Sequence, residues 1–150
     1  MSTNPPSLPI NLGVSVTISR AARKRILAEA AQSPNEEVCG LLFGGESRIV
    51  SVLPTINIAD NPANSFEIDP AALFAAIRNQ RGGGERIVGH YHSHPEGPAR
   101  PSVRDTEMAL DTGRLWLIVT AGEMSLWRAG APGQLEPVEL ALASPPSNRQ

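Results

Sequence analysis

The sequence has few of the residues that mark several common classes of protein. It contains one cysteine in 150 residues, so it forms no internal disulfide, and this usage is typical of a reducing compartment. No apolar run approaches the length of a membrane span. Residues 1–12 have neither the basic start nor the long apolar core of a secretory signal. We therefore expect a cytoplasmic protein without a membrane segment.

An excess of one charge is also missing. Thirteen Lys and Arg against fifteen Asp and Glu give a net charge of −2, which offers no electrostatic basis for binding nucleic acid or a membrane surface. Aromatic residues make up 4% of the chain, but 41% of it is hydrophobic, enough for a normal core. We predict one domain over residues 13–142, with a flexible lead-in at 1–12 and a flexible tail at 143–150.

Helices are predicted by apolar spacing and by their start signals. Ser19 and Asp69 are suitable N-caps, and Pro70 is favoured at the first position of a helix. Ser102 or a neighbour begins a third helix. The predicted helices span residues 20–32, 70–81 and 102–111.

Strands are predicted at 14–18, 38–44, 48–53, 66–68, 86–92, 115–120, 124–128 and 135–142. The run 38–44 is continuously apolar, as in a strand buried on both faces, and its Gly40 indicates close approach of another chain segment. Residues 54–65 are rich in Asn, Asp and Pro and are predicted to form a loop. Strands with dispersed helices indicate an α/β or α+β fold with a mixed central sheet.

The three histidines of the chain lie together, at His90, His92 and His94, and Ser102 and Asp105 follow across a proline-containing loop. Side chains two residues apart on a strand share a face, so His92 and His94 can present two imidazoles to one point. Asp105, early in a helix, can add a carboxylate oxygen. Two imidazoles and a carboxylate form a three-ligand zinc set that leaves a position for water, which is typical of catalytic sites. Spacing alone does not exclude His90 as a ligand.

This stretch resembles the signature of the JAMM (MPN+) metallopeptidases, which reads His-x-His-Pro, a short loop, and Ser-x-x-Asp. The matching segments are His92-Ser93-His94-Pro95, Ser102-Val103-Arg104-Asp105 and, upstream, Glu37-Val38-Cys39-Gly40. The resemblance extends over roughly residues 14–142. It implies a curved mixed sheet flanked by about three helices, a core like that of cytidine deaminases, with zinc at one end.

The resemblance also implies roles for individual residues. His92, His94 and Asp105 are the expected ligands of one Zn²⁺ per chain, together with a catalytic water. Glu37 is the expected general base, which takes a proton from water and passes it to the leaving amine, and Ser102 is the expected donor to the oxyanion. Local structure offers competing interpretations, because Ser102 and Asp105 also fit a helix capping box. Glu36 is expected on the surface, Cys39 in the core and His90 in the wall of the groove.

The substrate follows from a narrower resemblance. The chain has no room for the two insertions of the eukaryotic members, which cleave ubiquitin chains, so it is similar to the stand-alone prokaryotic type. That type implies zinc-dependent hydrolysis of an amide bond at the C-terminal tail of a small ubiquitin-like or sulfur-carrier protein, leaving a Gly-Gly end. The alternatives are a phage-tail or cell-wall peptide hydrolase and a non-catalytic MPN scaffold. The presence of all five expected site residues argues against the scaffold, and the sequence indicates no oligomeric state.

Overall fold

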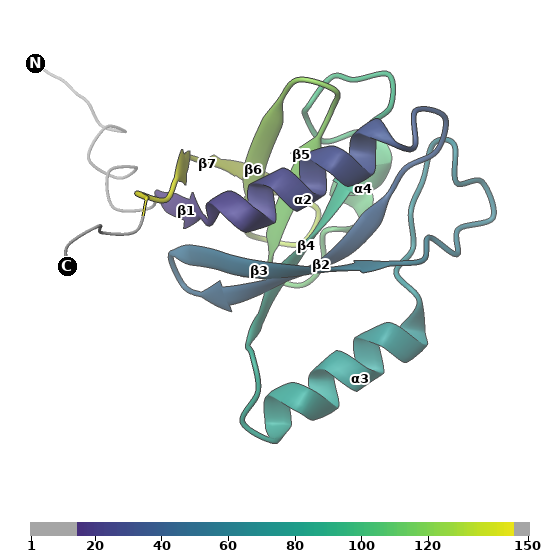
Figure 1. The fold of residues 1–150 in the computed structure, drawn as a ribbon. Coiled ribbons are helices and arrows are strands. Elements are labelled where there is room, and N and C mark those ends of the chain that lie inside the picture. Colours follow the sequence, from purple (N-terminus) through teal and green to yellow (C-terminus); the bar gives the residue numbers. More distant parts are fainter. Residues whose placement is uncertain (1–14, 146–150) are drawn as a thin grey trace, which may run out of the picture.

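The computed structural model describes residues 15–145, which form a mixed eight-stranded sheet and three helices (Figure 1). The fold class is the predicted one. The helices are α2 (Arg20–Ala31), α3 (Pro70–Arg81) and α4 (Val103–Met108), and the strands are β1 (Val16–Ile18), β2 (Cys39–Gly45), β3 (Arg48–Thr55), β4 (Ile87–Ser93), β5 (Leu115–Val119), β6 (Met124–Ala129), β7 (Leu135–Val138) and β8 (Leu140–Leu142). The predicted lead-in at 1–12 and positions 146–150 of the predicted tail lie outside the described residues.

The sheet is curved and nearly closed. Its strand order is β7-β6-β5-β4-β2-β3-β1-β8, so β7 and β8 occupy opposite edges although only Glu139 separates them in the chain. One residue can span only ~3.5 Å, so the two edges must lie close together. The prediction of a single strand at 135–142 was therefore wrong. The apolar pattern continues across the break, while the chain changes its pairing partner from β6 to β1.

Two other predicted elements differ from the structure. Residues 66–68 form no strand, and the segment contributes a single bridge between Asn57 and Ile68. The third helix ends at Met108 instead of near Asp111. Gly113 then adopts a φ of 93°, and its N–H donates to the carbonyl of Ala129, which turns the chain into β5. This turn uses the residues that would have formed another helical turn.

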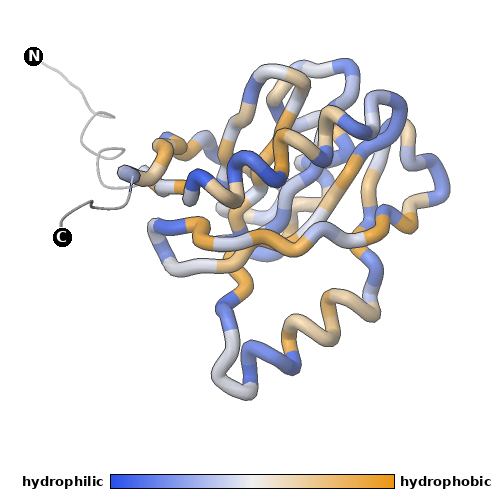
Figure 2. The backbone as a smooth tube through the Cα atoms, in the orientation of Figure 1, coloured by the Kyte–Doolittle hydropathy of each residue, from blue (hydrophilic) through white to orange (hydrophobic). Residues whose placement is uncertain are grey.

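The helices cover both faces of the sheet. Helix α2 packs its buried Ala22 and Ile26 against one face, and the predicted N-cap Ser19 accepts a hydrogen bond from the N–H of Ala22 (Figure 1). Helix α3 lies against the opposite face, where Ala76 packs in a second cluster with Leu41, Phe43 and Ile87. The apolar residues of β2 alternate between these two clusters, and hydrophobic segments run through the centre of the molecule (Figure 2). No helix within residues 15–145 has the length and hydropathy needed to cross a membrane.

Strand β4 is tied to its neighbours at its centre. The buried Tyr91 donates a hydrogen bond of 2.6 Å from its hydroxyl to Glu29 of α2. Gly40 of β2 makes this possible, because a Cβ at this position would lie 2.5 Å from that hydroxyl and from the carbonyl oxygen of Leu53. The close approach predicted for Gly40 is confirmed. The hydrogen bond from Tyr91 to Glu29 anchors β4 to α2, and it thereby positions the end of the strand that carries the histidines.

Candidate metal centre

The carboxyl end of β4 brings two imidazoles to one point. His92 is fully buried and pairs with Cys39 of β2 and Ile118 of β5. His94 follows the last residue of β4, but its N–H still donates to the carbonyl of Val119, at 2.9 Å, so the extended course continues. The Nδ1 atom of His94 lies 2.8 Å from the carbonyl oxygen of Pro98 and donates to it. That bond leaves Nε2 free and turns it toward His92.

The start of α4 supplies a carboxylate. Asp105 accepts a hydrogen bond of 2.9 Å from the N–H of Ser102, and its own N–H donates to the Ser102 hydroxyl oxygen at 3.0 Å. This is the capping box that the spacing predicts, and it fixes both side chains. The Ser102 oxygen is the acceptor in this pair, so its O–H remains able to donate toward solvent or a ligand.

The three side chains form a compact triangle. The Nε2 atoms of His92 and His94 lie 3.1 Å apart, and Oδ2 of Asp105 lies 3.2 Å from the first and 3.1 Å from the second. A tetrahedral zinc ion with bonds of ~2.0–2.1 Å holds neighbouring ligand atoms roughly 3.3 Å apart. The triangle therefore fits zinc in both the kind of atom and the spacing. Within the described residues, these three are the group whose atoms could share one cation.

The charge states of His92 and Asp105 also suit a cation. Burial lowers the pKa of His92, which keeps the imidazole neutral, the form that binds metal. Burial alone would raise the pKa of Asp105, but its short polar contacts with His92 and His94 and the hydrogen bond from the N–H of Ser102 outweigh it and hold the pKa well below its usual range. The carboxylate is thus ionised.

Glu37 lies two residues before the start of β2, and hydrogen bonds hold both its backbone N–H and its backbone carbonyl. Its N–H donates to the carbonyl of Pro62 at 2.8 Å, and its own carbonyl accepts from the side-chain amide of Asn57 at 2.9 Å. Its side chain is among the few buried charged groups, whereas Glu36 is exposed as predicted. Burial raises the pKa of Glu37 to about 7, against the opposing effects of the neighbouring His94 and Arg104. A carboxyl group with such a pKa can both accept and release a proton near neutrality.

Glu37, His94 and Ser102 line one cleft with a volume of about 420 Å³. Asn64 and Ala63 of the 54–65 loop form part of its wall, and Glu96 and Gly97 form another part. The cleft is large enough for an extended peptide segment of a few residues. The structure therefore brings together the five residues that the sequence singles out, from β2, the end of β4 and the start of α4.

Two residues of the site were not predicted. The ring of Phe66 stacks on His92 with a centroid separation of 4.2 Å and an angle of 15°, which fixes the plane of the imidazole. Asn57 holds both Glu37 and the carbonyl of Ser65. No spacing rule connects either residue to the histidines. His90 lies apart from the triangle, with its ring 4.5 Å from that of Trp116.

A family profile described as prokaryotic homologs of the JAB domain matches residues 19–130. The chain belongs to this family. A desampylase of Haloferax volcanii is 36% identical over 109 residues, which cover 69% of this chain and 78% of that protein. A probable TtuB-protein conjugate cleaving protease of Thermus thermophilus is 30% identical over 117 residues, covering 70% and 78% of the two chains.

A solved structure shares the fold. The solution structure of protein DSY2949 from Desulfitobacterium hafniense superimposes with a TM-score of 0.73 and 28% identity, covering 87% of this chain and 94% of that one. The resemblance to the JAMM metallopeptidases is confirmed, and this member of the JAB family is a hydrolase.

Proposed function

We propose that this JAB-family hydrolase is a zinc peptidase that releases a ubiquitin-like or sulfur-carrier protein by hydrolysing the amide bond at its C-terminal tail. The triangle of two imidazole nitrogens and one carboxylate oxygen, open toward Glu37 and Ser102, is the observation that supports it most. His92, His94 and Asp105 are the proposed ligands. The names of the Haloferax and Thermus relatives support the choice of substrate.

Each residue around the triangle has a separate role in the proposed hydrolysis. Zinc held by such a ligand set acts as a Lewis acid, which polarises a carbonyl group and lowers the pKa of water. Glu37 takes a proton from the attacking water and delivers it to the nitrogen of the leaving amine. The Ser102 hydroxyl donates to the oxygen of the carbonyl as negative charge develops on it. Phe66 and Pro98 hold the two imidazoles in place.

We expect Ser102→Ala to lower kcat by ~10²–10³-fold, the usual cost of removing one oxyanion donor. The variant also loses the N-cap of α4, which should cost about 1 kcal/mol of stability. Ser19→Ala is a matched control, because it removes the N-cap of α2, away from the cleft. The control should lose similar stability in thermal unfolding and keep its kcat. Equal kcat values for the two variants would rule out the donor role.

The substrate proposal is tested with a carrier protein of the TtuB type, joined through its terminal Gly-Gly either to a lysine side chain or to a linear peptide tail. Zinc-loaded protein should cleave directly after Gly-Gly, as read by intact mass, and should leave peptidoglycan stem peptides uncut. Cleavage of the wall peptides with an intact carrier conjugate would instead favour the cell-wall hydrolase. Binding of the conjugate without cleavage would favour the scaffold.

A further inference from the structure

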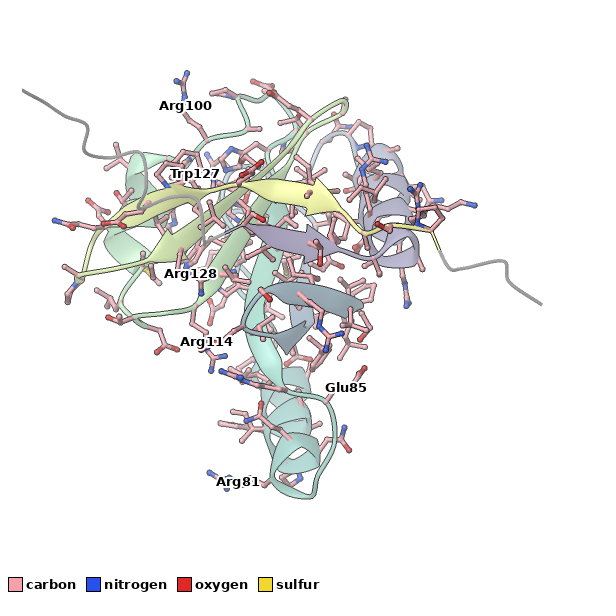
Figure 3. The ribbon with its side chains drawn as sticks, turned by 90° about the vertical axis from the view of Figure 1, so that its left-hand side faces the viewer. Arg81, Glu85, Arg100, Arg114, Trp127 and Arg128 are labelled. Carbon is pink, nitrogen blue, oxygen red and sulfur yellow. The ribbon has the colours of Figure 1, made fainter. Side chains whose placement is uncertain are left out.

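Three arginines gather at the end of the sheet opposite the metal centre. Strands β4 and β5 are parallel, with Gly89 opposite Leu115, and Leu115 pairs in turn with Arg128 of β6. Arg86 and Arg114 immediately precede β4 and β5, so they lie at the same end as Arg128. His94 is five positions beyond Gly89, roughly 17 Å along the strand. Figure 3 shows Arg114 and Arg128 close together, with Arg100 of the loop before α4 far from both.

The arginines line a polar cavity of about 430 Å³. Arg114 is fixed, because its Nε donates to Asp111 at 3.0 Å and another of its nitrogens donates to the carbonyl of Ile87 at 2.8 Å. Within residues 15–145, neither Arg86 nor Arg128 has a carboxylate within ion-pair distance. The exposed Glu46 is the other acidic residue of the lining. Arg128 does donate to the carbonyl oxygen of Gly113, at 3.4 Å. Three clustered guanidinium groups, two of them without a carboxylate partner in the described part of the chain, favour an anion in a chain of net charge −2, and their planar N–H groups match phosphate oxygens.

A second cavity, of about 260 Å³, adjoins the first and shares Ile87, Asp111 and Arg114 with it. Its other walls are mostly apolar and include Leu73 of α3 and Trp116 of β5. The partly exposed His90 also lines it, with its ring 4.5 Å from that of Trp116. Neighbouring aromatic rings favour a flat organic group that packs beside them.

We propose that the two adjoining cavities bind a small phosphate ester. The phosphate group lies among Arg86, Arg114 and Arg128. The flat organic part lies between α3 and Trp116, beside His90. The combined volume suits a molecule of the size of a nucleoside monophosphate. The ligand is bound away from the cleft that holds Glu37 and Ser102, so the proposal does not depend on the peptidase function.

The test is a titration of the zinc-loaded full chain, followed by amide and arginine side-chain NMR signals. The probes are adenosine monophosphate, inorganic phosphate and adenosine. Adenosine monophosphate should bind at least tenfold more tightly than either part alone. It should shift the signals of Arg86, Gly113 and Trp116 and leave those of Ser93 and Ser102 unchanged.

The double variant Arg86→Ala/Arg128→Ala should bind adenosine monophosphate at least tenfold more weakly. Arg86→Lys/Arg128→Lys keeps the charge and the fold and should show a smaller loss. Arg20→Ala/Arg23→Ala makes the same change of charge on the exposed side of α2 and should keep the wild-type affinity.

Four results would overturn the proposal. They are no shift in the cavities at millimolar ligand, equal losses in the two alanine variants, shifts centred on the metal site, and adenosine or phosphate binding as tightly as the complete ester.

Discussion

Replacement of Glu37 by glutamine is expected to reduce kcat by on the order of 10²–10⁴-fold, the range that general acid–base catalysis contributes. Glutamine nearly matches glutamate in shape, so the hydrogen bonds to Pro62 and Asn57, which involve only the backbone of residue 37, remain. The amide cannot accept the proton of water. Zinc content, measured by elemental analysis, should therefore stay at the wild-type level while single-turnover hydrolysis of a carrier conjugate slows.

Glu36→Gln is the matched control, since it makes the same change one residue away on an exposed side chain. Its kcat should equal that of the wild type. A Glu37→Gln variant that keeps zinc and also keeps most of its rate would contradict the general-base role. A slow Glu36→Gln variant with a fast Glu37→Gln variant would show that the assignment is wrong by one residue.

Asp105→Ala is expected to eliminate measurable hydrolysis and to weaken zinc binding by more than ~100-fold, because even loss of an outer partner of a metal ligand costs 10–100-fold. The variant leaves two imidazoles, one fully buried, with no carboxylate between them. Zinc affinity is measured by competition with a chromogenic chelator. Activity should return in part when zinc is raised well above the new dissociation constant.

The loss of stability in Asp105→Ala can be separated from the loss of zinc. Asp105 is the N3 residue of the α4 capping box, and Asp69 is the N-cap of α3, where its carboxylate accepts from the N–H of Ala71, so both are carboxylates that hold a helix start. Asp69→Ala should lose about 1 kcal/mol of stability and retain both zinc and activity. Normal zinc affinity in Asp105→Ala would remove this residue from the ligand set.

Most of the metal centre could be predicted, because the positions of its residues follow from short stretches of sequence. His92 and His94 need only a strand, and Ser102 and Asp105 need only a helix start, so alternation and capping are sufficient to place them. Glu37 is different, since its place beside His94 depends on the pairing of Cys39 with His92 in neighbouring strands. Its position was predicted through the family motif, because spacing between distant segments does not determine strand order.

The features that sequence reasoning missed depend on long-range contacts. Phe66 reaches His92 through packing alone, and a phenylalanine flanked by polar residues carries no sign of which ring it will meet. The break between β7 and β8 at Glu139 could not be predicted from the sequence either, because the apolar residues on its two sides continue the same alternation. In both cases tertiary structure overrides the local pattern.

The break between β7 and β8 at Glu139 also affects the tendency of this protein to self-associate. Within residues 15–145, the outermost strands of the sheet are β7 with four residues and β8 with three, and β7 contains Pro137, which has no backbone N–H to donate. Long, flat outer strands are templates for fibril growth, and short or proline-containing ones are not. Because the segment is divided into two short strands at the two edges of the sheet, the protein is protected against edge-to-edge aggregation at high concentration.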